Sequence, residues 1–257
     1  MNEERGRLQR VGLPPLAYAR AAGRAPTLVF LPGFASDMEG EKARRVAQIC
    51  AARGQAVLRF DYSGHGASGG RFEDGTIGGW RDDALAVIDA LTDGPLVLVG
   101  SSMGGWLALL VALARAPRLA GLIGIAAAPD FTEILMWSAM PFTARETLMR
   151  EGRIMAPSPY GAPTPITRAL IEDGRRHLLL EQPIPLTCPV RLLHGQADAD
   201  VPWEVSLRLA EQITGGDVVV TLVKDGDHRL SRPSDLALLG ATVAGLLGPG
   251  LLGENGG

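Results

Sequence analysis

The sequence predicts an α/β fold, with a mostly parallel central sheet flanked by helices and a small helical cap insertion. Apolar, β-branched runs alternate along the chain with patterns typical of amphipathic helices, which indicates a parallel sheet. One apolar run, residues 95–99, ends in Gly100-Ser101-Ser102-Met103-Gly104, and a helical pattern follows at once. Of the 257 residues, 46% are hydrophobic, which is enough for one domain with a sizeable core.

The first predicted elements occupy residues 1–128. Residues 27–31 and 55–61 are strands by their apolar character, whereas a strand over 16–20 is weakly marked. The helix over 41–53 has an apolar stripe, and Gly54 ends it. A second helix covers 79–92. The helix over 104–116 is apolar all round, which indicates deep burial, and the strand over 119–128 follows Pro117.

Between residues 129 and 185 the alternation of strands and helices breaks. Helical patterns over 130–140, 143–151 and 164–180 are separated by proline-rich stretches. The alternation then resumes with strands over 188–195 and 217–224 and helices over 203–213 and 233–247. We therefore expect a core built from residues 1–128 and 186–257, and a helical cap or lid formed by 129–185.

The cap supplies candidate walls for a substrate pocket. Methionine and aromatic side chains suit a flexible acyl chain, and they also suit simple packing of the cap onto the core. The candidates are Met38 in the loop after the strand over 27–31, and Met136, Trp137, Met140, Phe142 and Met155 in the insertion.

The Gly-x-Ser-x-Gly stretch carries the main chemical signal. A serine between a buried strand and a helix sits on a sharp turn, the geometry of a nucleophile elbow. Gly100 and Gly104 provide the space that this turn needs, and Gly105 lets the helix start close to the sheet. The helix N-terminus beside Ser102 favours a developing oxyanion. We therefore predict that Ser102 is a nucleophile.

A serine nucleophile at neutral pH needs a base and an orienting carboxylate. Asp198, Asp200 and Asp227 all follow predicted strand ends, where open α/β sheets place their ligands, and His228 follows the last predicted strand. His65 lies in a glycine-dense loop and could border the pocket, but we expect a loop residue there rather than the base, because His228 is better placed. The residue pattern alone leaves the choice among these acids open.

The composition excludes several other classes. A net charge of −3 with scattered arginines argues against a nucleic-acid partner. No apolar run approaches the length of a membrane span. The two cysteines do not suggest a disulfide framework, and the start of the chain lacks a secretory signal pattern, so we expect a cytoplasmic protein. The four histidines show no metal-ligand spacing, and we expect neither metal nor cofactor.

Five motifs resemble the α/β-hydrolase superfamily over nearly the whole chain. The motifs include the stretches Leu31-Pro32-Gly33-Phe34, Asp61-Tyr62-Ser63-Gly64-His65-Gly66, Gly100-Ser101-Ser102-Met103-Gly104, His194-Gly195-Gln196-Ala197-Asp198 and Asp227-His228-Arg229. More narrowly, the set is similar to the mitochondrial palmitoyl-protein thioesterases of this superfamily, which are also described as acyl-glucuronide esterases.

The resemblance assigns roles to particular residues. The superfamily pattern His-Gly-x-x-Asp-x-x-Val-Pro implies Asp198, rather than Asp200, as the triad acid. The chain order serine, acid, histidine implies His228 as the base. The backbone N–H groups of Phe34 and Met103 are the implied oxyanion-hole donors.

These roles predict a serine hydrolase that cleaves carboxylic esters or thioesters through an acyl-enzyme. The expected substrate is a small acyl ester or thioester, or an S-acylated protein. Carbon–carbon bond hydrolysis or perhydrolysis on the same triad is an alternative. A non-catalytic ligand-binding protein of this fold is a second alternative, because fold alone does not define function.

Overall fold

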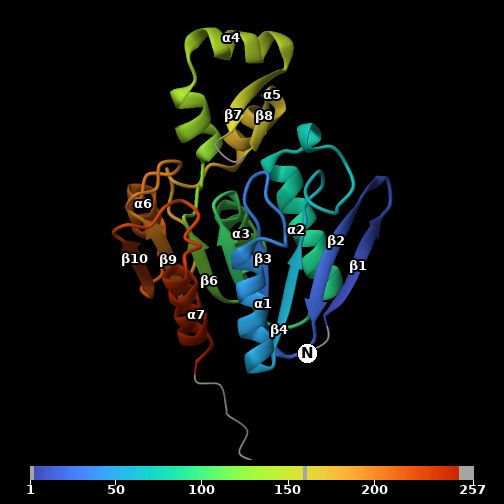
Figure 1. The fold of residues 1–257 in the computed structure, drawn as a ribbon, viewed down its shortest axis with the longest axis vertical. Helices are drawn as coiled ribbons and strands as arrows, with labels where there is room; N and C mark the ends of the chain where they lie inside the picture. Colours follow the sequence, from blue (N-terminus) through green and yellow to red (C-terminus); the bar gives the residue numbers. More distant parts are fainter. Residues whose placement is uncertain (1–2, 159–160, 249–257) are drawn as a thin grey trace, which may run out of the picture.

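The computed structural model describes residues 3–158 and 161–248. Its centre is an eight-stranded sheet in the order β1-β2-β4-β3-β5-β6-β9-β10 (Figure 1). The strand bounds are Glu4–Arg10 (β1), Leu13–Ala21 (β2), Arg24–Leu31 (β3), Gln55–Phe60 (β4), Leu96–Ser101 (β5), Leu119–Ile125 (β6), Val190–Gly195 (β9) and Val218–Val223 (β10). The strands from β4 to β10 in this order run parallel, and β2 pairs antiparallel with both β1 and β4. The predicted α/β fold with a mostly parallel sheet is confirmed.

Helices cover both faces of the sheet, as a parallel sheet requires. The core helices are Glu41–Arg53 (α1), Ile77–Leu91 (α2), Met103–Ala114 (α3), Glu204–Gln212 (α6) and Pro233–Leu247 (α7). Alternate residues of β5 point to opposite faces: Leu96 and Leu98 pack with α2 and α3, whereas Val97 and Val99 pack with α1 and α7. In Figure 1, α1 and α7 lie side by side on their face.

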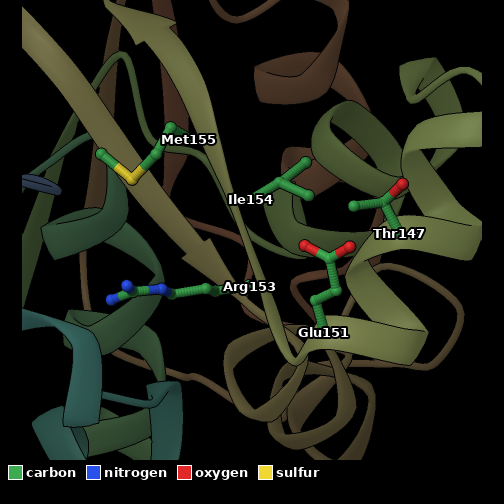
Figure 2. Close-up of a pocket in the computed structure, with 5 residues that line it drawn as sticks. All are labelled: Thr147, Glu151, Arg153, Ile154 and Met155. Atoms are coloured by element: carbon green, nitrogen blue, oxygen red, sulfur yellow. The ribbon is translucent and has the colours of Figure 1, made fainter.

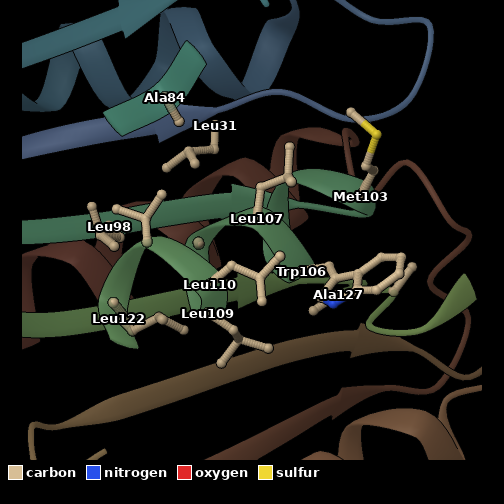
Figure 3. Close-up of a cluster of buried hydrophobic side chains, with 14 of the residues drawn as sticks. Leu31, Ala84, Leu98, Met103, Trp106, Leu107, Leu109, Leu110, Leu122 and Ala127 are labelled. Carbon is tan, nitrogen blue, oxygen red and sulfur yellow. The ribbon is translucent and has the colours of Figure 1, made fainter. Parts of the chain in front are cut away.

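The helix after Ser102 is the most deeply buried of these. Ten of the twelve residues of α3 are buried, which agrees with its apolar character all round. Its side chains, including Trp106, Leu107 and Leu110, pack against Leu98 of β5 and Leu122 of β6 (Figure 3). The start of this helix is therefore fixed relative to the strand ends.

The segment between β6 and β9 extends away from the carboxyl ends of the strands, at the top of Figure 1. It contains a π-helix over Thr132–Trp137, α4 (Phe142–Glu151), the hairpin strands β7 (Arg153–Ser158) and β8 (Gly161–Thr167), α5 (Arg168–Gly174) and a 3₁₀ turn over Arg175–His177. The hairpin was not predicted. The expected helix over 164–180 is replaced by the end of β8, the short helix α5 and the 3₁₀ turn, so this segment is not purely helical.

One hydrogen bond ties the extension to the core, and two others tie the first residues of the extension to its last residues. Asp173 of α5 accepts a hydrogen bond of 2.6 Å from the backbone N–H of Gly78 in the first turn of α2. Asp130 accepts bonds of 2.8 and 2.9 Å from the N–H groups of Leu179 and Leu180. Among residues 3–158 and 161–248, no helix combines the length and apolar character needed to cross a membrane.

Candidate active site

Ser102 occupies a strained turn between β5 and α3. Its backbone angles are φ 55° and ψ −121°, a region of backbone conformation that residues other than glycine rarely adopt. The neighbouring strand holds this conformation, because the Ser102 N–H donates to Ile125 O at 2.9 Å and the Ser102 carbonyl accepts from Ala128 N–H at 3.1 Å. Backbone strain of this kind persists only where the surroundings enforce it, and it concentrates at functional sites.

The two flanking glycines are required by close backbone contacts. A Cβ on Gly100 would lie 2.2 Å from the Gly104 carbonyl oxygen, and a Cβ on Gly104 would lie 2.0 Å from that of Leu31. Neither position can therefore hold another residue without a backbone shift. The predicted reason for these glycines is confirmed.

Three side chains from distant parts of the sequence form one hydrogen-bonded line. The His228 Nε2 atom lies 3.1 Å from Ser102 Oγ, and its Nδ1 atom lies 2.8 Å from Asp198 Oδ2. Asp198 follows β9 and His228 follows β10, so both lie at the carboxyl ends of parallel strands. The fold thus brings the predicted nucleophile, base and acid within hydrogen-bond distance.

The Asp198 carboxylate accepts four hydrogen bonds. Its Oδ1 atom accepts from the N–H groups of Asp200 and Val201 at 2.9 and 2.8 Å, and Oδ2 faces His228 and, at 3.2 Å, His194 Nε2. Burial alone would raise the pKa of Asp198, but the bonds from His194, His228 and Val201 outweigh it and hold the pKa well below its ordinary value. Asp198 is therefore ionised throughout the neutral range and can orient His228.

The rival acids are placed differently from Asp198. A carboxylate oxygen of Asp200 lies within 4.8 Å of ligand atoms of both Asp198 and His228. Asp200 contributes its backbone N–H to Asp198, and its side chain is exposed. Asp227 accepts a hydrogen bond of 2.9 Å from the N–H of Leu230, within the local turn.

The loop after β3 runs close beside the serine. A Cβ added to Gly33 would lie 3.4 Å from Ser102 Cβ. Within the described part of the chain, the N–H groups of Phe34 and Met103 have no hydrogen-bond acceptor. Met103 is the first residue of α3, where the helix leaves N–H groups unpaired. Both donors are thus available to a ligand atom, and their role as oxyanion-hole donors stays a prediction.

The side chain of His65 holds this loop in place through hydrogen bonds to its backbone and to Ser63. Its Nε2 atom accepts a bond of 3.3 Å from the N–H of Ala35, whose φ is 53°, and its Nδ1 atom donates to Ser63 O at 3.2 Å. The ring is buried, and burial lowers its pKa. A neutral His65 therefore fixes the loop that carries Phe34, and it does not approach the serine as a base.

The predicted pocket-wall residues fall into two groups. Met136, Trp137 and Met140 are partly buried in one apolar cluster with Phe34, Leu148, Ile166 and Ile171. Phe142 is 73% exposed, so it forms no interior wall, and Met155 is 57% exposed. Met38 was also misplaced: it is buried against Ala17 and Ala19 of β2, because its N–H donates to Asp61 and turns the loop toward that strand.

The extension contains a cavity of its own. A cavity of about 400 Å³ between α4 and β7 is lined by Thr147, Glu151, Arg153, Ile154 and Met155 (Figure 2). It lies within the extension, and it includes none of the Ser102, His228 and Asp198 side chains.

In the described residues, the candidate metal-ligand group is Asp198, Asp200 and His228, whose ligand atoms lie within 4.8 Å of one another. Both ring nitrogens of His228 already face hydrogen-bond partners, Asp198 and Ser102. The geometry is therefore that of a hydrogen-bonded triad rather than of a metal site.

The sheet order, the strained serine between β5 and α3, and the loops at the strand ends define the α/β-hydrolase class. The sequence profile of the family described as serine aminopeptidase, S33, matches residues 24–158, just over half of the chain. The chain belongs to this family.

The comparisons also identify similar proteins. The mitochondrial palmitoyl-protein thioesterase ABHD10 of Mus musculus is 43% identical over 242 residues, which cover 93% of this chain and 81% of the relative. The structure of mouse α/β hydrolase domain-containing protein 10 has a TM-score of 0.88 at 42% identity, covering 95% of this chain and 98% of that one. A crystal structure from Agrobacterium vitis S4 has a TM-score of 0.91 at 40% identity, covering 96% and 99%. The predicted resemblance to palmitoyl-protein thioesterases is confirmed.

Proposed function

We propose that the chain is a serine hydrolase that cleaves carboxylic esters or thioesters through an acyl-enzyme. The observation that carries this proposal is the hydrogen-bonded line from Ser102 Oγ through His228 to Asp198 at the end of the sheet. A buried carboxylate, an imidazole and a serine in this order form a nucleophile with its base already in place.

The proposed mechanism assigns one task to each group. His228 takes the Ser102 proton as Oγ attacks the acyl carbon, and Asp198 stabilises the imidazolium that forms. The N–H groups of Phe34 and Met103 bind the oxyanion of the tetrahedral intermediate. His228 then protonates the leaving thiol or alcohol, and a water molecule repeats the cycle on the acyl-Ser102 ester. Each oxyanion donor contributes about 3 kcal/mol of transition-state stabilisation in sites of this kind.

A long acyl chain is the substrate group that the apolar surroundings favour. Phe34, which carries a proposed oxyanion donor, belongs to the same apolar cluster as Met136, Trp137 and Met140 of the extension. An acyl group bound at Ser102 would therefore meet an apolar surface under residues 129–185, which we propose act as a cap. The name of the mouse relative, palmitoyl-protein thioesterase, supports a fatty-acyl thioester as the substrate class.

More than one kind of substrate can carry the acyl group. A small acyl ester or thioester, or an S-acylated protein, would present the same acyl group to Ser102. The mouse relative is named as mitochondrial, and this name does not support the expectation of a cytoplasmic location.

A substrate panel tests the proposal. The panel comprises p-nitrophenyl esters from acetyl to palmitoyl, a palmitoyl thioester, and an aminoacyl p-nitroanilide, because the family description includes an aminopeptidase. We expect Ser102-dependent ester and thioester hydrolysis that rises with acyl-chain length, with Ser102→Ala inactive. Turnover confined to the anilide, or no turnover by a folded protein, would contradict the proposal.

A further inference from the structure

A second histidine contacts the Asp198 carboxylate, at the same oxygen that faces His228. His194 is the fifth residue of β9, and its side chain is completely buried. Its Nε2 atom lies 3.2 Å from Asp198 Oδ2, the same oxygen that faces His228 Nδ1 at 2.8 Å. The sequence analysis includes His194 in the motif that contains Asp198 and assigns it no role.

The partners of His194 define its protonation. Its Nε2 atom faces two groups that can only accept, the Asp198 carboxylate and the Val201 carbonyl oxygen at 3.0 Å, so Nε2 carries a proton. In the neutral ring the other nitrogen, Nδ1, is an acceptor, and it accepts from the hydroxyl of Ser206, a buried residue of α6 that lies 2.7 Å away. Ser206 therefore holds the ring in the orientation that directs Nε2–H at Asp198.

The Val201 backbone completes a closed arrangement. Its N–H donates to Asp198 Oδ1 at 2.8 Å while its carbonyl accepts from His194. Rotation of the Asp198 carboxylate would break bonds on both of its oxygens. A donor on Oδ2 also withdraws negative charge from the oxygen that attracts the His228 ring.

We infer that His194, held by Ser206, is a positioning residue of the triad: it fixes the Asp198 carboxylate and moderates the attraction of Asp198 for protonated His228. This inference rests on the proposed function, because it concerns the groups assigned to catalysis there. His194 does not touch the substrate position; it acts on His228 through Asp198.

Other polar or charged groups surround Asp198 and His228, and a test must leave these groups unchanged. They are Ser102 at the start of α3, Lys42 of α1, whose charge interacts with Asp198 and Asp227, Asp200 in the loop after β9, Ser206 of α6, and Asp227 and Arg229 beside His228. Burial lowers the pKa of Lys42 to about 8. Its titration therefore belongs to the alkaline side of a pH profile, away from the acid limb.

Two variants of His194 separate its contacts. The His194→Gln side chain can place an amide N–H near the Nε2 position, which retains the donor to Asp198 and loses the Ser206 contact. The shorter His194→Asn side chain reaches the Nδ1 position, which retains the Ser206 contact and loses the donor to Asp198. The pair thus matches in polarity and differs in the bond of interest.

The readout is the pH dependence of kcat/KM for a p-nitrophenyl ester. Loss of the donor in His194→Asn concentrates charge on Asp198, which stabilises protonated His228. We expect the acid limb to move upward by about half a pH unit and kcat/KM at neutral pH to fall about tenfold. In His194→Gln the acid limb should stay at the wild-type position. Equal limbs in the two variants, whether shifted or not, would overturn the inference.

A second measurement does not depend on turnover. The proton shared by His228 Nδ1 and Asp198 gives a low-field NMR signal, which we expect to move further downfield in His194→Asn and to stay in place in His194→Gln. If His194→Asn fails to fold, His194→Leu replaces it, because leucine has a similar volume and also lacks the donor to Asp198, and it should produce a shift of the same sign. An unmoved signal in the donor-deficient variant overturns the inference. Absence of ester turnover by wild-type protein with a moved signal would instead refute the proposed function alone.

Discussion

Replacing Asp198 by asparagine is the substitution that most sharply separates the assigned acid from its neighbour Asp200. Asparagine has nearly the same shape and supplies only one acceptor oxygen. If that oxygen stays with the N–H groups of Asp200 and Val201, at 2.9 and 2.8 Å, the amide NH₂ replaces Oδ2. It then faces His228 Nδ1 and His194 Nε2, which are both donors in the native arrangement.

The clash between the asparagine NH₂ group and the His228 N–H group changes which ring nitrogen of His228 carries the proton. To relieve it, His228 must move its proton to Nε2, and that atom then presents N–H to Ser102 Oγ, 3.1 Å away, and cannot accept the serine proton. Substituting amide for acid in the triad of a serine protease of another fold lowers kcat by about 10⁴-fold. We expect a similar loss here, which corresponds to about 5.5 kcal/mol of activation free energy.

Asp200→Asn is the matched control. Asp200 contributes its backbone N–H to Asp198, and this group is unaffected by the substitution. We expect a change of no more than about twofold in kcat, as for most surface substitutions. The assay is the steady-state hydrolysis of a p-nitrophenyl ester by both variants. A severe loss in Asp200→Asn together with a mild one in Asp198→Asn would refute the assignment of the acid.

The same variant makes a prediction about stability and pH. The pKa of Asp198 is lowered in the folded chain from its ordinary value of 3.8. A carboxyl group with a lowered pKa stabilises the fold above its unfolded value and loses that contribution as the pH falls through the folded one. Asparagine has no such dependence. The difference in unfolding free energy between wild type and Asp198→Asn should therefore shrink below about pH 3.8, and a difference that grows on acidification would contradict the described bonds.

Three further substitutions test the geometry around the serine. Gly104→Ala should destabilise the fold by about 3 kcal/mol or more, because its Cβ would meet Leu31 O, whereas Gly216→Ala, with open space around it, should change stability by less than about 0.5 kcal/mol in urea unfolding. Ser102→Gly should be about 1 kcal/mol more stable than Ser102→Ala, because only glycine relieves the strain at φ 55°; equal stability of the pair would mean that the turn is unstrained. His65→Gln tests the buried imidazole: since its pKa is lowered, the unfolded chain binds more protons below pH 6.5, and wild-type stability should fall on acidification more steeply than that of the variant, while parallel curves would exclude a neutral His65.

The core elements could be predicted where a physical signal marks their ends. The helix over Glu41–Arg53 has the predicted bounds, because Gly54 adopts a left-handed conformation that terminates it. The helix α2 begins at Ile77, two residues before the predicted start, since Thr76 rather than a later residue accepts the capping bond from Gly79 N–H.

Other elements carry no such signal. The strand Glu4–Arg10 is rich in charged residues on both faces, so no apolar alternation reveals it; its pairing with β2 and the ion pair of Glu3 with buried Arg59 hold it in place. The hairpin β7–β8 contains several prolines, which argue against a strand in a sheet interior and are tolerated in this isolated two-stranded sheet.

The site was more predictable than its surroundings. Glycine spacing indicates the serine turn, and the loops after strands indicate the proposed acid and base, because the topology brings these ends together. The positions of Met38 and Phe142 depend on where loops turn in three dimensions, which side-chain type does not encode. The proposed role of His194 was not predicted, because its partner Ser206 lies on another element, α6, and sequence spacing does not show that the two side chains meet.

Labelling of the folded protein with a fluorophosphonate, read by intact mass and peptide mapping, tests the central claim most directly. The claim is that Ser102 is a nucleophile activated by His228. The account predicts one adduct per chain, located on Ser102, absent in Ser102→Ala and formed far more slowly in His228→Ala. A folded protein that remains unlabelled, or an adduct on another residue with Ser102 unmodified, would contradict it.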